Sequence, residues 1–75
     1  MEDYKVVYDD QCIVEREDTG DIVTGKVLRY KPKEFIKVVL GGAVSINLKY
    51  EPAQKVYIGE KAKMPFVSNG PKRLK

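Results

Sequence analysis

The sequence has 75 residues, enough for one small domain, with 43% apolar residues and a net charge of +3. It has no histidine and one cysteine, Cys12, which excludes an internal disulfide and leaves too few thiol and imidazole groups for a zinc site. No apolar run approaches the roughly 20 residues of a membrane helix, and no secretory leader is visible. We therefore expect a cytoplasmic protein with no cofactor, no bound metal and no membrane partner.

The first half of the chain predicts short strands separated by turns, because apolar residues alternate and no stripe of helical spacing appears. The alternation predicts strands over 4–8, 11–16 and 21–30. Turn formers at 17–20 (EDTG) predict a hairpin between the last two of these strands. Gly25 interrupts the third strand, where a glycine commonly marks a bulge or a sharp bend that lets a small sheet curl.

The second half of the chain continues this pattern, with predicted strands at 35–40, 43–50, 55–58 and 61–67. Pro32 cannot donate to a strand ladder and predicts the turn before the first of them, and Gly41-Gly42 predicts a hairpin after it. The range 43–50 alternates most regularly, which predicts one buried and one solvated face. Gly59 ends or bends the next strand, and Pro65 confines the last one to an edge or a strand end.

Five to seven short strands at regular spacing are typical of a small all-β barrel. The sequence therefore predicts a strongly bent antiparallel barrel as one domain over 1–67, followed at 68–75 by a basic, flexible C-terminal tail. A domain of this size buries little surface, and no disulfide or metal is available to stabilise it. These limits favour association with further copies of the chain, and a small monomer with an adequate core is the alternative.

Charge is divided unevenly along the chain. Residues 1–25 carry a net charge of −6, and residues 26–75 carry +9. Such an asymmetry indicates either a basic surface that binds phosphates or complementary faces that join neighbouring subunits. A solvated surface with neither role is the third interpretation.

The residues that could support catalysis are few. Cys12 lies between Gln11 and Ile13 without a histidine or a cluster of cations, so a buried structural cysteine is the favoured interpretation. Asp9-Asp10 could indicate Mg²⁺ binding, but adjacent acids on a strand point to opposite faces, and a solvated turn is favoured. We therefore expect that the protein is not an enzyme.

Basic residues surround an aromatic ring at Arg29, Tyr30, Lys31 and Lys33, and Lys37 follows on the next predicted strand. Single-strand binders place cations against phosphates and rings against bases in this way. A second basic cluster comprises Lys61, Lys63, Lys72, Arg73 and Lys75. Ordinary solvated lysines are the alternative for both clusters, and Tyr30 fits a barrel interior as well as a stacking platform.

The stretch from Cys12 to about Val67 resembles the Sm-like proteins, which include the Sm, LSm and bacterial Hfq types. The segments that carry the resemblance are IVE at 13–15, the turn at 18–20, the strands at 22–27 and 35–40, and VYIGE at 56–60. The five-residue spacing from Gly20 to Gly25 matches the family's first motif, and Gly59 closes the core of the second. The match extends over about three-quarters of the chain.

The resemblance implies a homo-oligomeric closed ring in which exposed strand edges pair with neighbouring subunits. The edge residues that it indicates are Val56, Ile58, Met64 and Phe66. It also implies single-stranded RNA as a partner, but with a degenerate base pocket. Lys31 and Lys37 stand around the turn where the family has an acidic residue and an asparagine, and Ile58 replaces the arginine before the glycine of the second motif.

Two functional hypotheses follow. The first is a non-enzymatic Sm-like ring that binds single-stranded RNA or a related nucleic acid, with phosphate contacts from Arg29, Lys31, Lys33 and Lys37 and stacking on Tyr30. The second is a structural or protein-interaction barrel, oligomeric and without a nucleic-acid function. The missing pocket residues and the divided charge favour this alternative.

Overall fold

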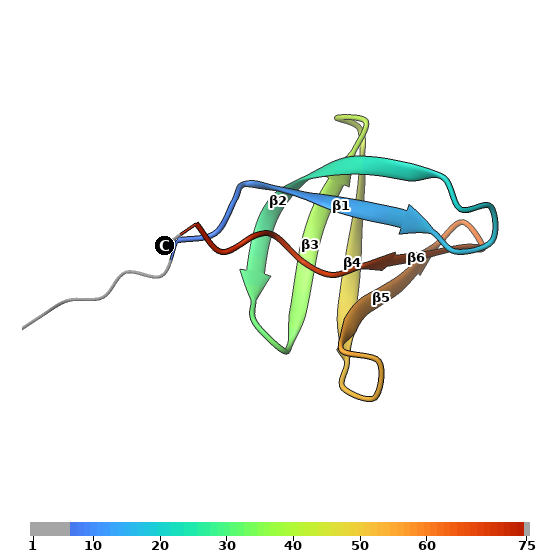
Figure 1. Cartoon of the computed structure of the whole chain (residues 1–75). Coiled ribbons are helices and arrows are strands. Elements are labelled where there is room, and N and C mark those ends of the chain that lie inside the picture. The colour runs from blue at the N-terminus through green and yellow to red at the C-terminus, as the bar shows by residue number, and fades with distance from the viewer. Residues whose placement is uncertain (1–6, 75) are drawn as a thin grey trace, which may run out of the picture.

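The computed structural model describes residues 7–74, which form a closed barrel of six antiparallel strands (Figure 1). The strands are β1 (Gln11–Arg16), β2 (Ile22–Lys31), β3 (Phe35–Leu40), β4 (Val44–Glu51), β5 (Val56–Lys61) and β6 (Met64–Ser68). Each strand pairs with the next in sequence, and β6 returns to pair with β1. The predicted small antiparallel barrel is confirmed, and the described residues contain no helix that could cross a membrane.

The core is built by the alternation that the sequence predicts. In β4, Ile46 and Leu48 are buried while Asn47 between them is exposed, so one face of the strand lines the interior. The buried apolar side chains are Cys12, Val14, Ile36, Val38, Ile46, Leu48, Tyr57 and Phe66. Burying each of the larger aliphatic and aromatic chains contributes about 1.5–3 kcal/mol.

A β-bulge in β2 lies at Leu28 rather than at Gly25, where the sequence predicted it. The register pairs Val27 with Val38 and Arg29 with Lys37, which leaves Leu28 as an extra, exposed residue. Gly25 pairs regularly and is buried, and a Cβ there would approach the Leu40 side chain to 3.0 Å. Gly25 therefore serves close packing, and the bulge bends the strand three residues later.

Strand β5 continues through Gly59 to Lys61 instead of ending at the glycine. A Cβ at Gly59 would collide with the carbonyl oxygen of Asn47, so the glycine allows β5 to cross close to β4. The predicted strand at 61–67 is divided by a hairpin turn at Ala62 and Lys63, whose φ angles are 52° and 63°. These are left-handed conformations that Asn and Gly usually supply.

The C-terminal segment, predicted as a flexible tail over 68–75, is hydrogen-bonded to the rest of the chain. Ser68 belongs to β6 and is buried. Further along, the Asp9 N–H donates to the Lys72 carbonyl at 2.8 Å, and the Leu74 N–H donates to the Val7 carbonyl at 2.7 Å. The predicted strand at 4–8 lies mostly outside the described residues, and its last residue, Tyr8, forms an isolated bridge with Arg73.

Candidate nucleic-acid interface

The outer surface of β2, β3 and β4 gathers basic side chains at one end of the barrel. The bulge at Leu28 shifts the alternation of β2, so that Val27 and Tyr30 face the core while Arg29 and Lys31 face outward. We define the basic face as Arg29, Lys31, Phe35, Lys37, Asn47 and Lys49, whose registers form two rows across the three strands. One row is Arg29–Lys37–Asn47, and the other is Lys31–Phe35–Lys49.

The first row opposes two like charges. Arg29 and Lys37 are direct cross-strand partners and both are exposed. The Cβ atoms of such partners lie roughly 4.5–5.5 Å apart, and like charges at this position destabilise a sheet. An anion bound between them would remove that repulsion, so the pair is suited to a phosphate.

The cations of the basic face have few acidic partners. Within residues 7–74, the ion pair of the basic face joins Lys31 to Glu34 at 4.0 Å, and both side chains are more than half exposed. Exposed pairs of this kind contribute between nothing and about 1 kcal/mol. The pair therefore leaves Lys31 available to an anionic ligand.

The second row places an aromatic ring between two lysines. Phe35 pairs with Lys31 on one side and Lys49 on the other. It alternates with the buried Ile36, is half-buried, and is not among the side chains packed against the core. Sequence reasoning overlooked Phe35, although its alternation with Ile36 and Val38 was the signal that could have found it.

Tyr30 lies on the inner side of β2 and takes no part in the basic face. Its ring packs edge-on against Tyr8, with centroids 4.8 Å apart, and against Tyr57 at 5.8 Å. Its hydroxyl lies 3.1 Å from the Tyr57 hydroxyl. Burial, together with the bond to Tyr57, raises the pKa of Tyr30. Of the two interpretations left open for Tyr30, the geometry supports the barrel residue rather than the stacking platform.

Lys33 lies in the β2–β3 turn beside the basic face. Its φ of 63° is in the left-handed region, and its backbone N–H donates to the Tyr57 hydroxyl at 2.8 Å. Its side chain is exposed. The structure therefore brings Arg29, Lys31 and Lys37 together on one surface, with Lys33 at its border.

The four predicted edge residues divide between the two sides of the barrel wall. Val56 and Ile58 face outward on β5, whereas Phe66 is buried in the core and Met64 packs against it. Strand β5 pairs with β4 and β6, and β6 pairs with β5 and β1. Neither strand is an open edge of the sheet, because closure of the barrel within one chain gives each strand a neighbour on both sides.

Outward aliphatic side chains form a second surface, which borders the basic face where Ile58 pairs with Lys49. We define the aliphatic wall as Ile13, Val56, Ile58 and Val67. Ile13 is 57% exposed and Ile58 37%. Ile58 pairs directly with Val67, and Ile13, Val56 and Val67 line one shallow recess of about 180 Å³.

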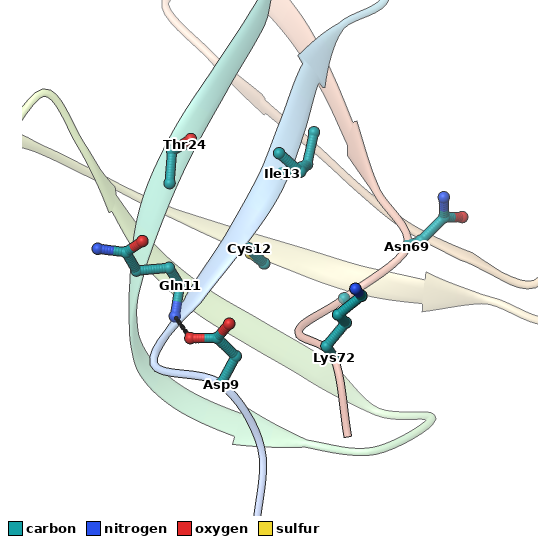
Figure 2. Close-up of a pocket in the computed structure, with 8 residues that line it drawn as sticks. Asp9, Gln11, Cys12, Ile13, Thr24, Asn69 and Lys72 are labelled. Carbon is teal, nitrogen blue, oxygen red and sulfur yellow. Dashed lines mark hydrogen bonds between the residues drawn. The ribbon is translucent and has the colours of Figure 1, made fainter. Parts of the chain in front are cut away.

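A hollow of about 320 Å³ opens where the C-terminal segment separates from β1 (Figure 2). Asn69 and Lys72 lie on one side of it, and Gln11 and Thr24 lie on the other. Cys12 is at its floor and is 5% exposed, and burial raises the pKa of its thiol. Cys12 is therefore buried, as the sequence predicted.

The acidic residues concentrate in the β1–β2 hairpin, at the end of β2 opposite to the β2–β3 turn (Figure 1). At the tip, the Arg16 guanidinium donates to Asp18 at 2.7 and 3.0 Å, and this bond lowers the pKa of that carboxyl.

Within residues 7–74, no group of three or more His, Cys, Asp or Glu side chains could hold a metal ion.

Comparison with known proteins gives no match to a family model, to a curated protein or to a solved structure.

Proposed function

We propose that this chain is a non-enzymatic Sm-like barrel that binds single-stranded RNA, or a related nucleic acid, through the basic face. The observation that carries the proposal is the cross-strand pair of Arg29 and Lys37 beside the outward ring of Phe35. Cations contribute affinity through the phosphates, and a ring between them offers a surface on which any base can stack. A single strand exposes both its phosphates and its bases to such a surface.

The Sm-like part of the proposal is supported by the roles of the motif glycines. Gly20 adopts a φ of 80° in the hairpin, and Gly25 is buried where a side chain would crowd Leu40. Gly59 allows β5 to approach the backbone of β4. At the family's pocket positions this chain has Lys31, Lys37 and Ile58, so we propose contacts with the nucleic-acid backbone in place of a uracil pocket. Ring formation remains part of the proposal, through surfaces other than free strand edges.

The affinity of a labelled single-stranded RNA, measured by fluorescence anisotropy over a range of salt concentrations, tests the proposal. Log affinity should fall linearly with log salt, by about 0.7 for each phosphate neutralised. The Lys31→Glu/Lys37→Glu variant should weaken binding roughly tenfold or more at low salt and flatten the salt dependence. Lys63→Glu, in the β5–β6 turn, is the control for a lysine charge reversal away from the face and should bind almost as wild type. Binding that ignores both salt and the paired reversal would overturn the proposal.

A second candidate function is a structural or protein-interaction barrel, and the exposed aliphatic wall favours it. Its occupant would be a second copy of the chain, since Val56 and Ile58 from the predicted edge lie on this wall. Apolar association persists at high salt, so a solution mass above the monomer in 0.5 M salt would support it. Failure to retain RNA or DNA on a filter at low salt would favour this function over the first.

A further inference from the structure

The acidic hairpin and the basic face lie at opposite ends of one strand. Ile22 begins β2 and Lys31 ends it. Arg29 and Lys31 lie at the far end of this strand from the hairpin. Across the barrel wall the two surfaces approach each other where Glu17 and Lys49 line one hollow. Within residues 7–74, Arg29, Lys31 and Lys37 form no ion pair with the hairpin, so they remain available to the hairpin of a second copy.

The hairpin matches the basic face in charge and in apolar content. We define the acidic hairpin as residues 15–22, which carry a net charge of −3. Its cation, Arg16, is bonded to Asp18 within the same hairpin. Asp21 also interacts with Arg16, whereas Glu15 and Glu17 form no ion pair within residues 7–74.

An apolar side chain also marks each surface. Ile22 is 65% exposed, directly opposite Glu15 in the β1–β2 ladder. On the basic face, Phe35 occupies the corresponding central place between Lys31 and Lys49. The acidic hairpin thus has carboxylates around an exposed isoleucine, and the basic face has cations around an aromatic ring. Complementary charges of this kind steer two protein surfaces together.

We propose that the acidic hairpin of one copy docks on the basic face of a second copy, and that single-stranded nucleic acid displaces it. The contact joins two different surfaces, so it is head-to-tail and either closes into a ring or extends. The displacement step rests on the proposed function, because it requires that nucleic acid bind the same face. The hairpin then occupies the phosphate-binding residues whenever nucleic acid is absent.

Sedimentation velocity at micromolar concentration tests the docking. The wild-type chain should associate at about 20 mM salt and dissociate at 0.5 M, because exposed charges are screened within a few ångströms at high ionic strength. Glu17→Lys and Lys37→Glu should each be monomeric at low salt. Asp10→Lys, an exposed acid outside the hairpin, is the matched control for Glu17→Lys and should associate as wild type.

A charge-swap mixture guards against a variant that has simply misfolded. Glu17→Lys and Lys37→Glu, mixed at equal concentration, should form a dimer, because the unaltered hairpin of Lys37→Glu can dock on the unaltered basic face of Glu17→Lys. The mixture should grow beyond the dimer only if the reversed charges at positions 17 and 37 also meet at the second interface. Wild type that is monomeric at low salt, or a mixture that remains monomeric, would overturn the docking.

Adding a single-stranded RNA oligonucleotide to the associated wild type separates this inference from the proposed function. Release of monomer–RNA complexes supports both. RNA that binds without dissociating the assembly overturns the shared surface and leaves the proposed function standing. Association that RNA neither binds nor disturbs overturns the proposed function and the displacement together, and leaves the hairpin contact as a purely structural one.

Discussion

At the scale of single residues, the Tyr57 hydroxyl connects three parts of the barrel end. It accepts a hydrogen bond from the Lys33 N–H at 2.8 Å and lies 3.1 Å from the Tyr30 hydroxyl. Tyr57 is 4% exposed, and its ring lies among Tyr30, Tyr50 and the backbone of Gly70. One hydroxyl therefore holds the β2–β3 turn against β5, and this turn carries the border of the basic face.

Tyr57→Phe tests that role. It removes the acceptor for the Lys33 N–H while keeping the ring, so we expect the free energy of unfolding to fall by about 1–3 kcal/mol. Tyr50→Phe is the control, since the Tyr50 ring packs on Tyr57 with centroids 5.1 Å apart. Urea denaturation measures both, and equal losses in the two variants would contradict a special role for the Tyr57 hydroxyl.

Stability should also fall at alkaline pH. Burial raises the pKa of Tyr30 and of Cys12, so the folded chain retains protons that the unfolded chain releases. The contribution is complete below the unfolded values, about 8.5 for Cys and 10 for Tyr, and is lost as pH rises above them. Urea midpoints at pH 7, 9 and 10.5 should decline, and less steeply in Tyr30→Phe. A midpoint unchanged at pH 10.5 would exclude this linkage.

At the scale of elements, alternation was enough to predict most strands. The strand at 35–40 has the predicted bounds, and the predicted strands at 11–16, 21–30 and 43–50 match β1, β2 and β4 to within one residue at each end. These segments follow the simple rule that one face is buried. Departures from that rule are what the sequence could not predict. The bulge at Leu28 shifts the alternation of β2, whereas strict alternation would have placed Arg29 inside.

The β5–β6 hairpin was missed for a different reason. Its turn residues, Ala62 and Lys63, both have positive φ but neither is a residue that favours it. Because the turn contains no Gly or Asn, its sequence continues the alternation of apolar and polar residues that is typical of a strand. The same segment continues beyond Gly59, because that glycine serves contact with β4 and does not end the strand.

Replacing this turn with Asn-Gly should stabilise the barrel. In Ala62→Asn/Lys63→Gly both positions receive residues that adopt the left-handed region readily, which should raise the free energy of unfolding by about 1–2 kcal/mol. Thermal denaturation checks the gain. The control is Lys63→Gln, which removes the same positive charge and keeps a residue that disfavours the left-handed region at this position. A variant no more stable than wild type would show that the left-handed pair carries no strain.

At the scale of the whole molecule, closure decides which surfaces can bind. Every strand of the barrel has two neighbours, so we expect partners to bind its outward faces. The sequence located Arg29, Lys31 and Lys37 correctly on the surface, but it could not show which residues share a face. That information comes from cross-strand register, which brings Phe35, Asn47 and Lys49 from two further strands beside them.

The divided charge along the chain becomes a division in space. The acidic hairpin and the cations of β2 lie at the two ends of that strand (Figure 1), and the two surfaces approach each other only where Glu17 and Lys49 line one hollow. Long-range attraction between such surfaces, or toward a phosphate chain, accelerates association at low salt. This distribution is the property on which both proposals depend.

Mapping of backbone amide chemical shifts on addition of a short single-stranded RNA tests the account most directly. The account predicts that the perturbed amides gather on Arg29, Lys31, Phe35, Lys37, Asn47 and Lys49, while those of Ile13, Val56 and Val67 on the aliphatic wall keep their chemical shifts. Perturbations centred on Ile13, Val56, Ile58 and Val67, with the basic face unmoved, would contradict it.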